Sequence, residues 1–151
     1  MIQVEAGDIS TLAVRLGNSY PVIKAAKRAA FEAAAPQLKQ AVDSAIGGSG
    51  KVAGWQQQRV GSKGGYAAVS PRAKQTHKGY SVGYITNAIN SGHRFPSPSG
   101  KNPKYRPRIR SGKQRVQGKF FYEAANAKAE GIAQAAAAQV ADALKDHLEG
   151  K

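Results

Sequence analysis

The residues best suited to chemistry in this 151-residue chain are cations that alternate with uncharged residues. In the run Lys104-Tyr105-Arg106-Pro107-Arg108-Ile109-Arg110, every second side chain is positively charged. Alternate side chains share a face in an extended backbone, so these cations would lie along one edge, about 7 Å apart. Like charges so close repel one another unless phosphates or carboxylates neutralise them, and Arg binds either group in bidentate fashion. The pattern favours an anion-binding segment over a solvated basic loop or a charged edge strand.

This run belongs to a longer stretch, 94–118, which holds four Pro and eight basic residues. A structureless loop of that length is uncommon inside a compact domain, and is usually functional or ordered by a partner. We expect the stretch to face DNA or a neighbouring protein through seven cations: Lys101, Lys104, Arg106, Arg108, Arg110, Lys113 and Arg115.

The charge of the chain is concentrated in its centre. The formal net charge is +14, from 23 Lys and Arg against 9 Asp and Glu. Residues 44–122 carry 15 basic residues and no acidic one, whereas the two flanks together hold 8 basic and 9 acidic residues. A basic, acid-free centre of this kind indicates an anionic partner.

Residues for catalysis or metal binding are sparse. The chain has no Cys, which excludes disulfides, Cys-based zinc sites and thiol catalysis. His77, His93 and His147 lie far apart without metal-ligand spacing, and we expect His93 to be held against backbone in a turn. The Gly-rich run 47–51 is not a phosphate-binding P-loop, because Val52 follows Lys51 where that motif has Ser or Thr. We therefore expect no enzymatic activity, no metal and no cofactor.

The N-terminal flank of the basic centre is predicted to be helical over 8–46. Asp8 is a candidate cap for a short helix through Leu16, and Ser19 for a second helix that runs to about Ile46. Pro36 is expected to kink or split this second helix. The Gly-rich run that follows should end it.

The C-terminal flank is predicted to form one long helix over 119–149. An apolar stripe recurs there at helical spacing, and a helix of that length would span roughly 45 Å. Eleven Ala make it thin, so it can pack closely on another helix. The stripe consists of Phe121, Ala125, Ile132, Ala136, Val140, Leu144 and Leu148.

The centre, 52–118, is predicted to hold short strands and basic loops. Tyr80, Val82 and Tyr84 alternate with smaller residues, and 66–72 could pair with them as a hairpin. Trp55 and the strand-borne Tyr side chains are interpreted as sheet core and not as base-stacking platforms. The chain is thus predicted to be one α+β domain over 1–151, with N-terminal helices and a long C-terminal helix packed on a small, mostly antiparallel sheet.

Large apolar side chains are few. The hydrophobic share is 41%, but 27 of the residues in that class are Ala and only five are Leu. So few large side chains offset little of the conformational entropy lost on folding. We expect the chain to bury further surface against copies of itself or against a partner.

Two motifs and the order of elements resemble a known family. The motifs are Tyr84-Ile85-Thr86-Asn87-Ala88-Ile89-Asn90-Ser91-Gly92-His93-Arg94 and Gly118-Lys119-Phe120-Phe121-Tyr122-Glu123-Ala124. With the Ala-rich helices around them, they resemble the neck or tail-completion proteins of tailed bacteriophages, the Z-like minor tail proteins. The positions that match the family pattern are Tyr84, Asn90, Gly92, His93, Gly118 and Phe121, with Arg94 closing the first motif. Residues 54–59 depart from the family's usual step into the sheet, which leaves the start of the first strand open.

The resemblance implies a structural virion protein at the head-tail junction, without a catalytic site. It implies a ring around the DNA passage, hexameric or dodecameric, made of copies of this chain. Its other implied partners are the neighbouring head-tail connector and tail-tube proteins and, non-specifically, the packaged DNA. No membrane contact is expected, because no apolar run approaches the length of a span.

Two other functions compete with this one. The net charge alone would suit a sequence-independent nucleic-acid-binding protein, associated with the nucleoid or the ribosome. A metal-dependent nuclease would require folding to bring Asp43 and Glu123 together.

Overall fold

The computed structural model describes residues 6–48, 50–94 and 115–151. Within these ranges it holds five helices and three pairs of antiparallel strands, so the α+β class is confirmed. The long C-terminal helix is confirmed as well, and it begins two residues later than predicted. The elements are α1 (Ala6–Gly17), α2 (Ser19–Ile46), α3 (Lys51–Trp55), β1 (Gln56–Val60), β2 (Ala67–Pro71), β3 (Thr76–His77), β4 (Tyr80–Ser81), α4 (Val82–Ser91), β5 (Gly92–Arg94), β6 (Arg115–Gln117) and α5 (Phe121–Glu149).

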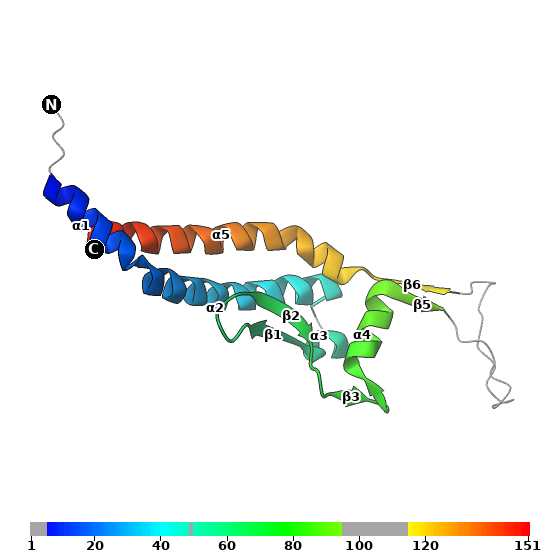
Figure 1. The fold of residues 1–151 in the computed structure, drawn as a ribbon. Helices are drawn as coiled ribbons and strands as arrows, with labels where there is room; N and C mark the ends of the chain where they lie inside the picture. Colours follow the sequence, from blue (N-terminus) through cyan, green and yellow to red (C-terminus); the bar gives the residue numbers. More distant parts are fainter. Residues whose placement is uncertain (1–5, 49, 95–114) are drawn as a thin grey trace, which may run out of the picture.

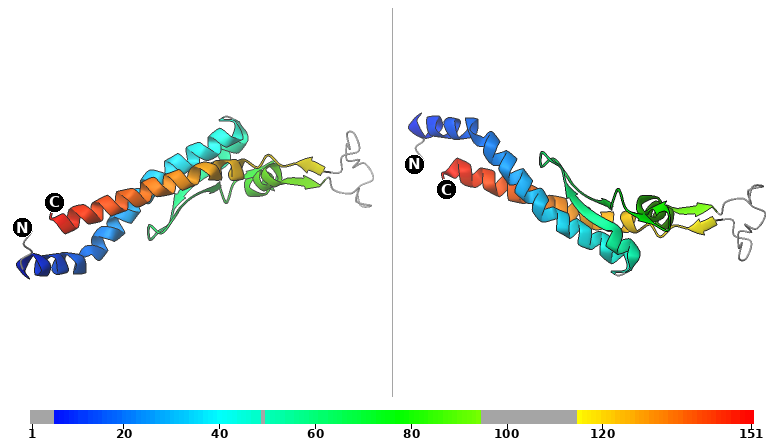
Figure 2. Two further views of the ribbon diagram at one scale, coloured as in Figure 1. Left: turned by 90° about the horizontal axis from the view of Figure 1, so that it is seen from above. Right: turned by 90° about the horizontal axis from the view of Figure 1, so that it is seen from below.

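The two long helices α2 and α5 lie side by side and antiparallel, and they form the body of an elongated molecule (Figures 1 and 2). Each is roughly 43 Å long at 1.5 Å per residue. Small side chains let the two helices approach closely: on α2 the buried residues include Ala30, Ala34 and Ala35, and on α5 they include Ala125. Both termini of the described chain lie at the same end of this pair (Figure 1).

The helix boundaries correct two predicted caps and exclude one of the two effects expected of Pro36, the splitting of the helix. α1 begins at Ala6, so Asp8 lies inside the helix and not before it. The cap of α2 is Asn18, and the Ser19 hydroxyl donates backwards to the Leu16 carbonyl at 2.7 Å. Pro36 neither splits nor ends α2, which continues to Ile46. The helix ends as predicted at the Gly-rich run, because Gly47 adopts the left-handed conformation at φ 109°.

The strands form three separate two-stranded ladders and not one sheet. β1 pairs with β2 from Gln56 opposite Pro71 to Val60 opposite Ala67, and both strands pack on α2. β3 and β4 make a short hairpin. β5 and β6 pair beyond the ends of the long helices and project from the body (Figure 1).

The predicted hairpin between 66–72 and the residues after 80 is wrong. β2 pairs with β1 instead, and Val82–Ser91 form the helix α4. This helix buries Val82, Thr86 and Asn90, spaced four residues apart, so a helical pattern outweighed the short alternation around Tyr84. Two helices, α3 and α4, thus lie in a stretch that was predicted to hold only strands and loops.

The aromatic side chains of the centre divide between core and surface. Trp55 is buried as predicted, and its ring lies 5.4 Å from that of His77. Tyr80 and Tyr84, predicted to be core residues, are 63% and 67% exposed and stack on each other with ring centroids 6.4 Å apart. The reason is that Tyr84 lies on the face of α4 opposite the buried residues.

The apolar core lies at the end of the helix pair nearest the projecting strands. Its buried members are Ala41 and Val42 of α2 and Phe121 and Ala125 of α5. Five elements meet at this end, because partly buried residues of α2, α3, β2, α4 and α5 pack against these four. The partly buried residues are Ile46, Val52, Val69, Ile89 and Tyr122. The core therefore supports the root of β5 and β6. Over the described ranges, no helix has the length and apolar character needed to cross a membrane.

Candidate functional site at the root of a two-stranded arm

The candidate site is the strand pair β5 and β6, called the arm below, together with the residues that hold it. Gly92 pairs with Gln117, His93 with Val116 and Arg94 with Arg115. The residues 95–114 therefore leave and rejoin the described structure at one point, the outer end of the arm. Lys101, Lys104, Arg106, Arg108, Arg110 and Lys113 fall in this interval and lie outside the described residues.

Two arginines form the outermost residue pair of the arm. Arg94 and Arg115 are exposed and directly opposite each other. Like charges opposite one another weaken a strand pair, and Arg115 lowers this cost by donating from Nη2 to the Ser91 carbonyl at 3.3 Å. An anionic group from outside would lower it further, because guanidinium binds phosphate and carboxylate alike. The electrostatics of the arm therefore favour a negatively charged partner.

The inner end of the arm, where Gly92 lies against Gln117 and Gly118, is called its root, and it requires two glycines. Gly92 has φ 78°, and a Cβ placed there would lie 2.7 Å from the backbone nitrogen of Gly118. A Cβ on Gly118 would lie 2.6 Å from the carbonyl carbon of Ser91. Real Cβ atoms do not come this close to backbone, so the two chain segments can approach here only because both residues lack a side chain. These are two of the glycines of the sequence motifs.

Asn90 joins the arm to the start of α5. Its side chain is 5% exposed, and its Nδ2 donates to the Glu123 carboxylate at 3.1 and 3.3 Å. Its Oδ1 accepts from the Tyr122 backbone N–H at 3.1 Å, and its carbonyl accepts from the Phe120 N–H at 2.9 Å. Since Phe120, which precedes α5, makes no side-chain cap of its own, Asn90 caps the helix from a distant part of the chain.

The electrostatics of this junction are those of a structural cap. Glu123 lies in the first turn of α5, where the helix dipole favours a negative charge. The other acid that a nuclease would need, Asp43, pairs instead with Lys39 on α2. Across residues 6–48, 50–94 and 115–151, no group of three or more His, Cys, Asp or Glu is arranged to hold a metal ion.

A buried polar contact continues from this cap into β1. The Tyr122 hydroxyl donates to Gln56 Oε1 at 2.6 Å, and Gln56, only 1% exposed, donates from Nε2 to the Val52 carbonyl at 3.0 Å. Partial burial raises the pKa of Tyr122 to about 12. Sequence reasoning missed both side chains, because a Gln in a run of three reads as a surface residue. The aromatic run after Gly118 was the one available signal for Tyr122.

The other motif residues divide around the arm. His93 lies in β5, exposed, and its Nδ1–H is directed at the Ala88 carbonyl at 3.4 Å, in line with the predicted backbone contact. Phe121 is 1% exposed and lies in the core beneath the root. Tyr84 is not part of the cluster, since it projects from the outer face of α4. The structure thus brings together Asn90, Gly92, His93, Arg94, Arg115, Gly118 and Phe121.

A second basic feature lies on the helical body. A cleft of about 400 Å³ is lined by Tyr20, Ile23, Lys24 and Lys27 of α2 and by Lys63 and Gly64 of the turn between β1 and β2. Three lysines from segments far apart in the sequence line it. No local motif predicted this cleft, because it forms only when the β1–β2 turn packs on α2.

The chain matches no protein-family model, no curated protein and no solved structure.

Proposed function

We propose that this chain is a structural virion protein of a tailed bacteriophage: a head-tail joining, neck or tail-completion subunit that forms a ring around the DNA passage. The observation that carries the proposal is the difference between the two ends of the subunit. One end holds a rigidly rooted arm from which a basic segment departs, and the other end exposes an apolar helix. Such a subunit acts by assembly, without catalysis or a cofactor, and its place is the head-tail junction of the virion.

The burial of apolar side chains supports an assembled state. Ten hydrophobic residues of the described chain are buried, and six of them are Ala. Ten large hydrophobic side chains of the same ranges are exposed. A chain that leaves as many large apolar groups in water as it buries apolar residues of any size gains stability from contact with further copies. A hexameric or dodecameric ring supplies that contact.

The charge of the arm supports a role next to DNA. Arg94 and Arg115 mark the place where a segment with six cations and no acid begins and ends. Contacts of Lys and Arg with phosphates are independent of base sequence, which suits a passage through which any DNA must move. An acidic surface on a neighbouring connector or tail-tube protein would satisfy the same cations.

The proposal is tested by locating the chain in phage particles by electron microscopy. We expect density at the head-tail junction, and particles made with Arg106, Arg108 and Arg110 all changed to Gln should lose at least tenfold of their joined heads and tails. The matched control changes Lys24, Lys27 and Lys63 to Gln, which removes the same charge from the body and should leave joining intact. Absence of the chain from particles overturns the proposal.

A second candidate function is sequence-independent nucleic-acid binding, and the body cleft specifically favours it. Three lysines gather there from α2 and from the β1–β2 turn, at a place separate from the arm. A protein that coats duplex DNA would use both basic surfaces, whereas a ring that contacts DNA through its arms would use one.

Salt dependence separates the two candidates. For duplex DNA the logarithm of the binding constant falls with the logarithm of the salt concentration by about 0.9 for each phosphate neutralised. If the chain coats DNA, each of the two triple variants should flatten this slope by up to about 2.7. A slope that changes only when Arg106, Arg108 and Arg110 are changed favours the ring, and negligible binding at physiological salt assigns the basic residues of 95–114 to protein contact.

A further inference from the structure

The helix α1 carries an apolar face that its own chain leaves uncovered. Ile9, Leu12 and Leu16 are spaced three and four residues apart, so they share one side of the helix. Each is at least half exposed. Val14 is also exposed, at 64%, but it lies on the opposite side of α1, and Tyr20, 74% exposed, belongs to the start of α2. Among the described side chains of α1, only that of Arg15 is not exposed.

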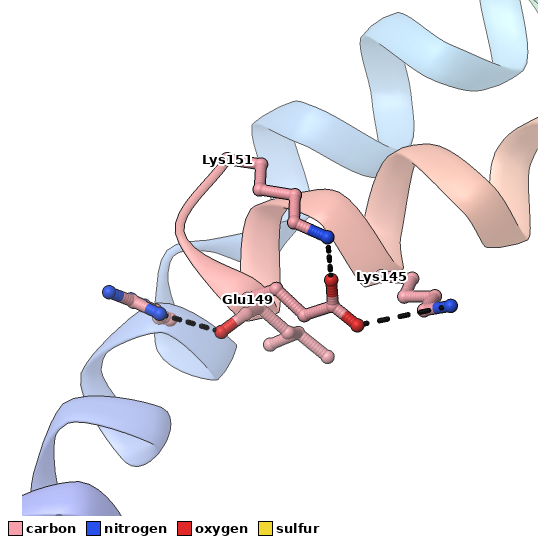
Figure 3. Close-up of polar contacts among 5 residues, drawn as sticks. Lys145, Glu149 and Lys151 are labelled. Atoms are coloured by element: carbon pink, nitrogen blue, oxygen red, sulfur yellow. Dashed lines mark hydrogen bonds and ion pairs between the residues drawn. The ribbon is translucent and has the colours of Figure 1, made fainter.

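The C-terminus of the chain holds α1 in this position. Arg15 donates from Nη1 to the Leu148 carbonyl at 2.8 Å, and the His147 imidazole donates to the Arg15 carbonyl at 3.0 Å. A Cβ on Gly150 would lie within 2.8 Å of the Arg15 guanidinium, so the chain end closes tightly over it. Figure 3 shows Glu149 between Lys145 and Lys151, with which it forms ion pairs of 3.9 and 2.6 Å. The two hydrogen bonds of Arg15 join α1 to the C-terminal end of α5.

An apolar groove of about 340 Å³ lies elsewhere on the molecule, and its lining contains no charged side chain. Along α5 it runs from Tyr122 to Ala136, about 21 Å, which accommodates the roughly 18 Å of a twelve-residue helix such as α1. The nearest groove residue, Ala136, lies about 16 Å along α5 from His147, the anchor of α1. The groove is lined by Phe31, Ala34, Leu38 and Val42 of α2, by 67–69 of β2, and by Tyr122, Ala125, Asn126, Ala129, Ile132, Ala133 and Ala136 of α5.

We propose that the apolar face of α1 in one copy docks into this groove of the next copy. The inference rests on the proposed function, for which it names the contact between subunits. Each chain offers one convex and one concave apolar surface, at two different places. A head-to-tail contact between them repeats from subunit to subunit, and a closed ring covers every such surface with none left over. Pairing of two α1 helices in a symmetric dimer would leave both grooves empty.

Charge also favours a contact at these two surfaces. The chain carries +14, so copies of it repel one another over long distances. The groove lining is uncharged, and the one cation on α1 whose side chain is described, Arg15, is turned to its own C-terminus. Copies therefore meet where repulsion is weakest. Added salt should strengthen this association while it weakens binding to DNA, because it screens repulsion in one case and attraction in the other.

Cysteine cross-linking tests the contact directly, because the chain has no Cys of its own. A Leu12→Cys preparation is mixed with an Ala133→Cys preparation and oxidised. We expect a disulfide-linked dimer that contains one of each, since Ala133 is exposed on the wall of the groove. Ala127→Cys is the matched control: it is exposed on the opposite side of α5 and should not cross-link with Leu12→Cys.

A charge placed on α1 tests the same contact without cross-linking. Leu12→Asp should weaken association at least tenfold in sedimentation velocity. Ser10→Asp adds the same charge to the opposite face of α1 and should weaken it less than threefold. Both side chains are exposed, so circular dichroism should show an unchanged fold for either variant.

The outcomes separate this inference from the function on which it rests. The inference is overturned if Leu12→Cys links mainly to itself, if no mixed dimer forms at the highest concentration the chain tolerates, or if both aspartates act equally. Particles that contain a ring of this chain without the Leu12 to Ala133 cross-link would refute the interface and leave the function standing. If the mixed dimer forms but the chain is absent from particles, the interface stands and the proposed function is refuted.

Discussion

The two ends of this subunit differ in how completely their side chains are buried and hydrogen-bonded within the chain. At the arm end, Asn90 makes side-chain bonds to α5, two glycines bring backbone into contact, and Phe121 is fully buried. At the α1 end, two hydrogen bonds through Arg15 hold a helix whose apolar residues face water. The arm end is specified by contacts within the chain, so changes there should unfold it. The apolar groups of the α1 end are exposed and, under the proposal above, contact the groove of another copy. Changes there should therefore affect association between subunits and leave the fold intact.

The largest difference should come from two adjacent phenylalanines at the arm end. Phe121→Ala removes a side chain that is 1% exposed and leaves a cavity, which should lower the free energy of unfolding by about 3–5 kcal/mol. Phe120→Ala removes one that is 47% exposed and should cost less than about 1 kcal/mol. Urea unfolding monitored by Trp55 fluorescence measures both. Equal losses would contradict the placement of the core beneath the arm.

The next effect concerns close approach at the root. Gly118→Ala forces a methyl group against the backbone of Ser91 and should destabilise by about 2–3 kcal/mol. Gly131→Ala is the control, since nothing lies within 4 Å of a Cβ there. In the middle of α5 that change should stabilise by about 0.5–1 kcal/mol. The thermal unfolding midpoints of the Gly118 and Gly131 variants should shift in opposite directions. A shift in the same direction would contradict the close backbone approach at Gly118.

The remote cap of α5 gives a smaller effect. Asn90→Ala removes the acceptor for the Tyr122 N–H and the donor to Glu123, which should cost about 1–2 kcal/mol. Hydrogen exchange should show faster opening of the first turn of α5. Asn126→Ala changes an exposed Asn on the same helix and should stay within about 0.5 kcal/mol. Unchanged exchange in the Asn90 variant would exclude this side chain as the cap.

The partial burial of the Tyr122 hydroxyl makes stability depend on alkaline pH. The pKa of Tyr122 is raised from its ordinary value of 10 to about 12, so the folded state holds the proton more tightly than the unfolded chain. The stability it contributes is complete below pH 10 and is lost as the pH rises towards 12. Tyr122→Phe should cost about 1 kcal/mol at neutral pH, because it leaves Gln56 Oε1 without its donor. The variant should also show a shallower loss in alkaline unfolding curves, and an identical slope would count against the assignment.

The smallest effect on folding is expected at the opposite end. Leu12→Ala trims a side chain that is already 50% exposed, so the free energy of unfolding of the dilute chain should change by no more than about 0.5 kcal/mol. Its self-association should weaken nevertheless. Urea unfolding at low and at high protein concentration separates the two effects. A loss as large as that of Asn90→Ala in the dilute chain would mean that α1 packs within its own subunit.

Several parts of the arm site could be predicted because they are adjacent in sequence to a recognisable turn or helix start. Asn90, Gly92 and Gly118 belong to two short motifs, and the pairing of β5 with β6 places those motifs side by side. Tyr84 belongs to the same motif, yet it is excluded from the site because a helix turns successive residues to different faces. Linear proximity therefore identified candidates but did not decide which of them meet.

Other parts could not be predicted, because they depend on contacts between distant segments. The β1–β2 pairing competes with the hairpin that the alternation around Tyr80 suggests, and only packing on α2 decides between them. Gln56 is buried because the Tyr122 hydroxyl, 66 residues away, supplies its partner. The lysine cleft on the body forms in the same way, from α2 and a turn far along the chain.

The sequence by itself determined the helical flanks, the confinement of positive charge to the centre and the exclusion of thiol chemistry. These properties depend on residue type and on spacing between near neighbours, which hydrophobic period and charge counts report directly. Only the tertiary structure decided which face of α4 is buried, how the arm is rooted and that the face of α1 stays uncovered. Such features depend on which surfaces meet across the whole chain, and that is settled by burial and long-range hydrogen bonding together.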